Sequence, residues 1–548
     1  MVMKIGLLFL LTLSLNFSFS QEHAWVYLGS KANVATHLAN PLTMLSQKAL
    51  DRRVNQGIAL DFSDVPVTPS YITDISGATG ITYVGVSKWL NAIHVIGSQV
   101  NINALLVTFP YVNNIEFADN SLNVGGRLSN AKSKLVHRNK FPTENTSRIV
   151  YDYGLAQNQI EMFKAHKLHE LNFTGAGITI AVIDAGFPNV DTNAGFDKIR
   201  TNGQILGGYD FVNNSSDFYT GNSHGSNVLS FIAGYYDGVT KYIGSAPEAS
   251  FYLYISEDAI PETPAEETYW VMAAEQADYV GVDIINTSLG YTTFDESRYN
   301  YDHTTDLDGN TSFITRGAEI AYTKGIVVIN AAGNSGTNVS WDGNVGMPAD
   351  GPNVLTIGAV NSAGSYASFS SRGPTSDNRL KPDVCVQGQG ASFINTAGAV
   401  TSGNGTSYSS PLLAGGVACL WQALPGKSNE EIIQYIKESS SIYTMPNYEL
   451  GYGIPNLELA RLLSISDLEL NEEISIYPNP STDNIKVSLP KSMGYASVVV
   501  FNVLGKKVIT QEVSLTDNII KISHLNSGVY LLKITNGNVS KTLKLVKE

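Results

Sequence analysis

The stretch ITIAVIDAG, residues 178–186, carries the clearest information about the fold. A run of apolar and β-branched residues leads directly into Asp184, which is typical of a strand buried on both faces of a parallel sheet. Similar runs recur later in the chain, and amphipathic stretches separate them. The strands are expected at 178–183, 282–286, 325–330 and 354–360, and the helices at 265–279 and 314–324. This alternation predicts an α/β fold with a parallel sheet flanked by helices and an active site beyond the carboxyl ends of its strands.

Three residues suited to nucleophilic hydrolysis lie at the ends of such elements. Asp184 follows the first strand, His224 precedes an apolar helical stretch, and Ser407 lies in GNGTSYSSP (403–411) before another. Because Pro411 fits the first turn of a helix, we expect Ser407 at or just before the helix N-terminus, where free N–H groups favour a developing negative charge. Taken singly, each residue has a commoner explanation, as a turn aspartate, a structural histidine or a helix-capping serine.

The combination is far more specific than its members. The chain order Asp184, His224, Ser407 is one of the known orders of a catalytic triad. Asn334, in AAGNSG after the strand expected at 325–330, can donate its side-chain amide to an oxyanion, with the Ser407 backbone N–H as a second donor. The sequence therefore predicts a hydrolase in which Ser407 attacks, His224 transfers the proton and Asp184 orients the imidazole.

Across roughly residues 150–463 the chain resembles the subtilisin-like serine proteases. The motifs that carry the resemblance are VID (182–184), HGS (224–226), SLG (288–290), AAGNSG (331–336), FSSRGP (369–374), KPDV (381–384) and GTSYSSP (405–411). The resemblance implies a subtilisin-like sheet and serine endopeptidase action on proteins or peptides, with no cofactor required. It also implies that Ser288, Leu289 and Gly290 form an edge strand that pairs with the substrate backbone.

Two departures from the family pattern lie beside the predicted triad. Ser226-Asn227 replaces the usual Thr-His, and Tyr408-Ser409-Ser410 replaces the usual Met-Ala-Ala. Because no triad residue is changed, we expect effects on subfamily and pocket shape rather than on activity. The alternative, an inactive protease scaffold acting as a surface binding protein, would usually lack a triad residue. An esterase would be expected to carry a Gly-x-Ser-x-Gly elbow, which Ser407 lacks.

The N-terminus and the overall composition favour export. Residues 1–20 have the pattern of a signal peptide, with Lys4, an apolar run at 5–15 and small residues before Gln21. Beyond this run, which is itself too short to span a bilayer, no stretch is apolar enough for a transmembrane helix. The net charge of −14 argues against nucleic-acid binding, which requires a basic face.

Residues 21–125 resemble the propeptides of secreted bacterial subtilases, especially in AWVY (24–27) and ALDRR (49–53). The resemblance implies a small α+β domain that assists folding and inhibits the enzyme until it is cleaved. The basic segment 126–150 is then a linker that contains the processing site, and 151–463 is the peptidase domain.

The C-terminal segment, residues 474–548, has a different composition. It carries nine lysines and four acidic residues, although the chain as a whole is acidic, and its short apolar runs predict a small antiparallel β-sandwich. It resembles the sorting domain of type IX secretion in Bacteroidetes-type bacteria, in IYPNP (476–480), NVLGK (502–506) and LNSGVY (525–530). This implies export through the outer membrane to the cell surface or the medium, with the secretion machinery as a partner. An accessory binding sandwich is the alternative.

Two further features bear on cofactors and redox state. Cys385 and Cys419 lie in apolar contexts, so we expect buried free thiols, although pairing in an oxidising compartment is the alternative. The segment DLDGN (306–310) resembles a calcium loop, but its glycine comes too early and the terminal glutamate is missing, which favours a polar turn. No metal site is therefore expected.

Overall fold

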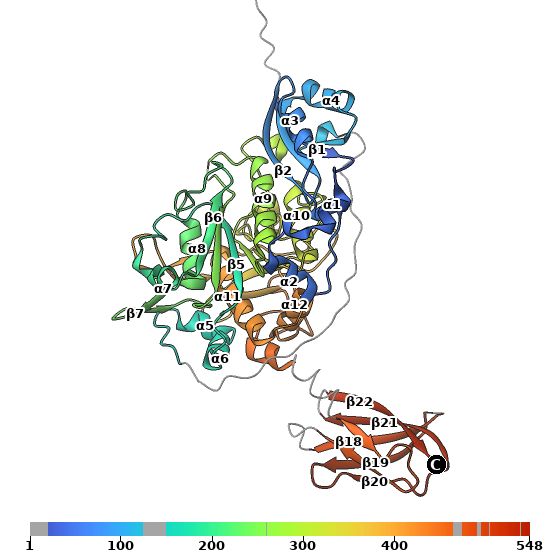
Figure 1. Ribbon diagram of the computed structural model, residues 1–548. Coiled ribbons are helices and arrows are strands. Elements are labelled where there is room, and N and C mark those ends of the chain that lie inside the picture. Colours follow the sequence, from blue (N-terminus) through green and yellow to red (C-terminus); the bar gives the residue numbers. More distant parts are fainter. Residues whose placement is uncertain are drawn as a thin grey trace, which may run out of the picture.

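The computed structural model describes residues 20–123, 150–258, 260–463, 474–489, 495–503, 505–536 and 539–548 (Figure 1). The expected signal peptide, apart from Ser20, and the linker up to residue 149 lie outside these residues. Within the described ranges, no helix has the length and apolar character needed to cross a membrane.

A seven-stranded sheet forms the centre of the peptidase region, with strand order β13-β12-β11-β10-β5-β9-β6. All neighbouring strands are parallel, which confirms the predicted α/β class. The strands are β5 (Thr179–Asp184), β6 (Ile205–Asp210), β9 (Ser250–Ile255), β10 (Ile284–Thr287), β11 (Val327–Ala331), β12 (Leu355–Val360) and β13 (Val384–Gln387). Two antiparallel hairpins lie outside this sheet, formed by β7 (Tyr235–Asp237) with β8 (Lys241–Ile243) and by β14 (Gln389–Ile394) with β15 (Val400–Asn404).

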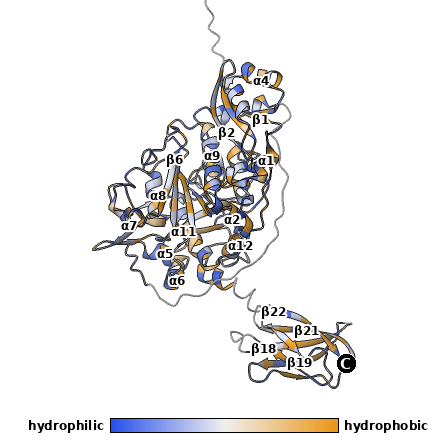
Figure 2. Ribbon diagram, viewed as in Figure 1, coloured by the Kyte–Doolittle hydropathy of each residue, from blue (hydrophilic) through white to orange (hydrophobic). Residues whose placement is uncertain are grey.

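The central strands are buried on both faces, as their continuous apolar pattern predicts. Along β5, Ile180 and Val182 belong to one hydrophobic core, whereas Ala181 and Ile183 belong to the other. This alternation follows from the two-residue period of a strand. The apolar colouring of the central strands is visible in Figure 2.

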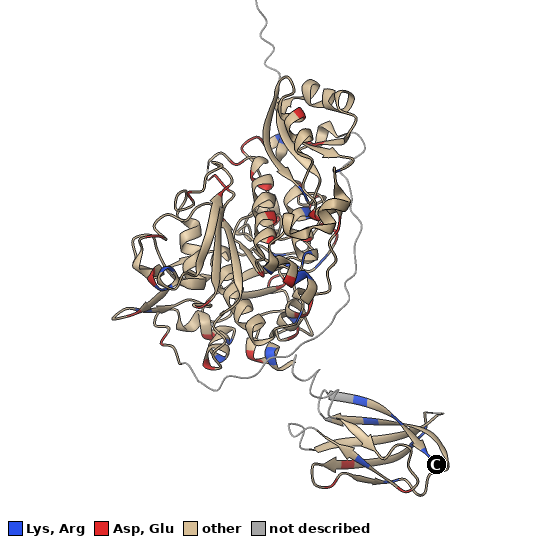
Figure 3. Cartoon of the chain, in the orientation of Figure 1, with Lys and Arg blue, Asp and Glu red and all other residues tan. Residues whose placement is uncertain are grey.

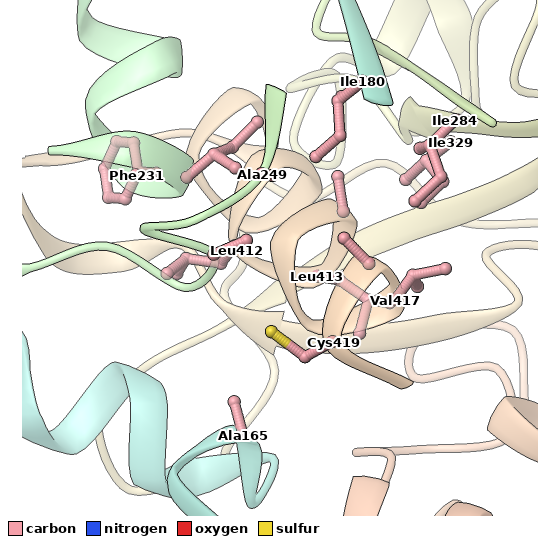
Figure 4. Packing of buried hydrophobic residues seen from close by; sticks show 14 of the residues in the cluster. Ala165, Ile180, Phe231, Ala249, Ile284, Ile329, Leu412, Leu413, Val417 and Cys419 are labelled. Atoms are coloured by element: carbon pink, nitrogen blue, oxygen red, sulfur yellow. The ribbon is translucent and has the colours of Figure 1, made fainter. Parts of the chain in front are cut away.

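Helices cover both faces of the sheet. The longest, α11 (Thr406–Ala423), packs Leu413 and Val417 among isoleucines of β5, β10 and β11 (Figure 4). α9 (Ala265–Val280) and α10 (Phe313–Thr323) belong to the second core. Further helices of this region are α5 (Gln157–Met162), α6 (Ala165–Glu170), α7 (Asp197–Thr201), α8 (His224–Ala233) and α12 (Asn429–Glu438). Cys385 and Cys419 are both buried free thiols, as expected.

Residues 20–123 form the expected small α+β unit, a four-stranded antiparallel sheet of order β2-β3-β1-β4 with four helices. Its elements are β1 (Gln21–Leu28), α1 (Val34–Ala39), α2 (Gln47–Asn55), α3 (Pro69–Ser76), β2 (Ile81–Ser87), β3 (Ala92–Ser98), α4 (Gln99–Thr108) and β4 (Val112–Phe117). Trp25 and Trp89 of this unit belong to the same core as α9 and α10. The two regions therefore pack as one body through those helices.

The C-terminal segment has its own hydrophobic core and two antiparallel sheets, of order β16-β17-β20 and β19-β18-β21-β22. The strands are β16 (Ser475–Tyr477), β17 (Asn484–Ser488), β18 (Tyr495–Asn502), β19 (Lys507–Ser514), β20 (Ile519–Lys521), β21 (Gly528–Asn536) and β22 (Val539–Lys547). Since Val487 and Leu532 of the two sheets share this core, the predicted small β unit is confirmed.

Candidate active site

The predicted catalytic residues lie at the carboxyl edge of the central sheet. Asp184 is the last residue of β5, His224 the first of α8 and Ser407 the second of α11. His224, Ser407 and Asn334 line one cleft of about 380 Å³, and residues 288–290 belong to the same lining. The structure thus brings together residues that are more than 200 positions apart in the sequence.

Asp184 and His224 are joined by a direct contact. The His224 Nδ1 lies 2.7 Å from the Asp184 Oδ1, which also accepts the Ala185 backbone N–H at 2.8 Å. Gly225 permits this approach, because a Cβ there would lie 2.4 Å from the Gly186 carbonyl oxygen. Asp184 is fully buried. Burial disfavours the imidazolium, but the Asp184 carboxylate outweighs this effect and raises the pKa of His224 above its usual value.

Ser407 is bonded to the opposite wall of the cleft. Its hydroxyl donates to the Ser288 carbonyl at 3.2 Å, and the Ser288 hydroxyl donates in return to the Ser407 carbonyl at 3.1 Å. Ser407 is 9% exposed. Ser407 thus lines the cleft together with His224, and its hydroxyl is bonded to the Ser288 carbonyl rather than to the imidazole.

The start of α11 differs from the expectation based on Pro411. The helix begins at Thr406 and Pro411 lies inside it, so Pro411 is not a first-turn residue. A proline inside a helix leaves the carbonyl four residues earlier without its N–H partner, and here that carbonyl belongs to Ser407. The Ser288 hydroxyl supplies the missing donor. Ser407 consequently sits in the first turn of the helix, where its own N–H is free of intrahelical bonds.

Asn334 follows β11 and is fixed through its side-chain oxygen. That oxygen accepts the Thr406 backbone N–H at 2.9 Å and the Thr406 hydroxyl at 3.2 Å. Because the oxygen is engaged, the amide NH₂ is the group that can donate into the cleft. This orientation is the one that an oxyanion donor requires.

Residues 288–290 continue β10 into the cleft without forming a strand. Among the described residues, no strand pairs with this segment, and pairing resumes at Tyr291, which bridges Met347. The edge-strand role of Ser288, Leu289 and Gly290 stays a prediction.

The sequence reasoning missed Glu257 and Glu262, which also line the cleft. Burial, reinforced by neighbouring carboxylates, raises the pKa of Glu257 to about 8 and that of Glu262 to about 7. Glu257 lies just after the end of β9, which pairs with β5. Its position beyond a strand end was the signal that could have found it.

The segment at 306–310 is a polar turn. One Asp308 oxygen accepts the backbone N–H groups of Asn310 and Thr311, at 2.8 and 2.7 Å. In the part of the chain that the structure describes, no group of three His, Cys, Asp or Glu residues is placed to hold a metal ion.

Family comparisons divide the chain into three parts. The Subtilase family (Peptidase S8) matches residues 175–453, the Peptidase S8 propeptide domain of Bacteroidota matches 23–137, and the secretion system C-terminal sorting domain matches 475–548.

Relatives of the peptidase region include Subtilisin of Bacillus pumilus, which is 31% identical over 312 residues, covering 56% of this chain and 98% of that protein. Subtilisin E of Bacillus subtilis (strain 168) is also 31% identical, over 56% of this chain and 70% of that protein. A crystal structure of MycP1 with its propeptide removed is 22% identical, covers 57% of this chain and 97% of its own, and gives a TM-score of 0.44. This chain belongs to the subtilase family of serine endopeptidases.

Proposed function

We propose that this protein hydrolyses peptide bonds through an acyl-enzyme on Ser407, and that it is made as an inhibited, exported precursor. The observation that carries the proposal is the 2.7 Å contact between His224 and Asp184 in a site whose cleft also presents Ser407 and Asn334. Membership of the subtilase family supports it.

The reaction follows from the roles these groups can take. Ser407 turns from the Ser288 carbonyl toward His224, gives its proton to the imidazole and attacks the scissile carbonyl. Asp184 stabilises the resulting imidazolium, as the raised pKa of His224 indicates. His224 then protonates the leaving amine, and a water molecule releases the acyl group by the same steps. No metal or cofactor is required for this sequence.

Stabilisation of the oxyanion is assigned to two donors. The Asn334 amide is oriented by Thr406, and the Ser407 N–H lies in the first turn of α11, where the helix dipole favours negative charge. Ser288, Leu289 and Gly290 would pair with the substrate backbone beside these donors.

The propeptide region supports a zymogen. Arg52 and Arg53 of α2 bind Asp278 of α9, and Glu116 of β4 binds Arg316 of α10 at 2.9 Å, all of them buried. Each of these buried charges has an ion-pair partner in the other region, although Arg53 also binds Asp64 of its own region. Separating the two regions would therefore break buried ion pairs. We propose that cleavage between residues 126 and 150 separates the two and activates the enzyme.

The C-terminal sorting domain indicates export to the cell surface or beyond. We further propose that the type IX machinery recognises residues 474–548 and carries the chain through the outer membrane. Intact mass and N-terminal sequencing of the exported protein would identify both processing sites.

Active-site labelling tests the proposed chemistry. Processed wild-type protein should react with a fluorophosphonate and degrade denatured casein, whereas Ser407→Ala should do neither. Absence of labelling, with wild type and variant indistinguishable on casein, would support the alternative of an inactive binding scaffold.

A further inference from the structure

Two glutamates that the proposed mechanism does not use line the active-site cleft. Glu257 and Glu262 lie in the loop between β9 and α9, and they share the lining of the cleft with His224 and Ser407. Among the described residues, neither carboxylate forms an ion pair with a lysine or an arginine. Because Ser407 lines the same cleft, a peptide substrate must enter the space beside the two acids. These acids can then affect which substrate side chains the cleft accepts.

The surroundings of the two carboxylates are acidic on nearly every side. The groups that act on Glu257 are Glu262, Asp184 at the end of β5, His224 at the start of α8, and the Tyr291 hydroxyl beyond β10. Glu262 faces Asp295, and Glu266 of α9 adds a further carboxyl against both. Tyr291 is 1% exposed, and its hydroxyl lies close to the Glu257 carboxyl. Among the described residues, this hydroxyl has no hydrogen bond of regular geometry. His224 is the single group in this set that can become cationic.

Two described residues of this loop are hydrogen-bonded to the first turn of α9. The two carboxylate oxygens of Glu266 accept the backbone N–H groups of Asp258 and Thr263, each at 3.0 Å. Asp258 directly follows Glu257 in the sequence, and Thr263 directly follows Glu262. Each cleft glutamate therefore adjoins a residue that is hydrogen-bonded to α9.

We propose that Glu257 and Glu262 make the enzyme select substrates with a lysine or arginine side chain close to the scissile bond, on the part of the peptide that lies in this cleft. The inference rests on the proposed function, because it assigns a preference to the same site. A cation between the two acids would meet two carboxylates without cationic partners of their own, and an arginine could bond to both through its planar fork.

The titration of the two acids supports this selectivity. With pKa values near 8 and 7, both carboxyls are partly protonated at neutral pH in the empty cleft. A bound cation would stabilise the ionised forms and lower both pKa values. The preference for a cation should therefore increase as the pH rises from 6 to 9, because ionising the acids then costs progressively less free energy.

Paired peptides provide the test. Internally quenched peptides would differ only in carrying arginine or its uncharged isostere citrulline at one of the three positions on either side of the cut. We expect kcat/KM of the wild type to favour arginine at one or more positions by about tenfold at pH 8. Both peptides require neutral His224 for cleavage. The titration of His224 therefore affects both kcat/KM values equally and cancels in the arginine-to-citrulline ratio.

Variants assign the preference to the two acids. The double change Glu257→Gln and Glu262→Gln should bring the arginine-to-citrulline ratio close to one, whereas Glu449→Gln, an exposed residue outside the cleft, should keep the wild-type ratio. A ratio near one in the wild type at every position overturns the inference without any variant, and so does a ratio unchanged in the double variant. Fluorophosphonate labelling distinguishes failure of the proposed function from failure of this inference. An enzyme that is not labelled contradicts the proposed function. A labelled enzyme without the preference for arginine contradicts only this inference.

Discussion

Figure 3 shows acidic positions along α9. Two groups of carboxylates, one on α9 and one in the loop before it, differ in what surrounds them. At the propeptide interface, Asp278 is bound by two arginines, and Glu275 accepts the backbone N–H groups of Lys88 and Trp89. In the cleft, Glu257 and Glu262 have mainly other acids as neighbours. We therefore expect the first group to contribute to the packing of the precursor and the second group to interact with a ligand. Changes at the interface should thus affect folding, and changes in the cleft should affect turnover.

The largest expected effect is that of Ser407→Ala. We expect kcat to fall by about 10⁶-fold, the size known for loss of the nucleophile in subtilisins. The free energy of unfolding of the precursor should change by no more than about 1 kcal/mol, because the change removes only the bond to the Ser288 carbonyl. Steady-state kinetics and urea unfolding would measure the two quantities. A large loss of stability would show that cleft and interface are not separable in this way.

At the interface, removing one partner of a buried pair should lower stability by about 3 to 5 kcal/mol. Arg316→Met removes the cation that faces the buried Glu116 carboxylate and keeps the Tyr27 hydroxyl as a donor to it, so the precursor should unfold at lower urea concentration. This measurement is best made with Ser407→Ala as background, which prevents self-cleavage.

The paired change Arg316→Met with Glu116→Leu sharpens the same prediction. Since neither charge remains, much of the lost stability should return. Failure of the double variant to recover would indicate that Arg316 acts through other contacts, such as its bond to the Ser312 carbonyl.

Loss of the oxyanion donor should lower kcat by less than loss of Ser407 does, and it should not affect stability. Asn334→Leu is expected to lower kcat by about 10²- to 10³-fold, as for the equivalent donor in subtilisins, with little change in KM. Asn338→Ser is the matched control, because residue 338 caps a surface turn and can keep that cap as serine. A rise in KM at constant kcat would assign Asn334 to substrate binding instead.

The sequence was sufficient to predict the strands around the site because burial on both faces leaves an uninterrupted apolar run. It was insufficient for β6, which contains two glycines, for β9, whose Ser250 and Tyr252 are only partly buried, and for β13, which has four residues. Asp184 and His224 could be placed because each adjoins a strong local pattern.

Two details of the site depended on tertiary contacts that no local pattern encodes. Pro411 lies inside α11 because a hydroxyl from residue 288 supplies the missing donor across 119 positions of sequence. Glu257 and Glu262 lie outside helices and strands, next to residues whose backbone N–H groups bond to Glu266. Propensity and hydrophobic period contain no information about either contact.

The smallest expected effect concerns a histidine pair at the interface. His23 of β1 and His94 of β3 lie 3.0 Å apart through ring nitrogens, and His94 also contacts the Thr268 hydroxyl of α9 at 2.7 Å. Burial lowers the pKa of His23 to about 4, a shift that Glu296 opposes and Arg298 reinforces, and burial together with His23 lowers the pKa of His94. Both rings are therefore neutral in the packed precursor.

Because the unpacked state binds more protons below pH 6.5, the interface should be fully stable above that pH and lose stability as the pH falls toward 4. Between pH 7 and pH 5 the loss should be roughly 1 to 2 kcal/mol for each ring that is protonated on release. Hydrogen exchange of β1 and β3 in the Ser407→Ala precursor would measure it. The change His23→Gln with His94→Gln should reduce the dependence of interface stability on pH. The change His37→Gln in α1, which lies away from α9, should leave this dependence unchanged. If the double variant keeps the same pH dependence of stability, the acid sensitivity would be assigned to the carboxylates of the interface. The two acidic regions around α9 would then resemble each other more closely than their contacts suggest.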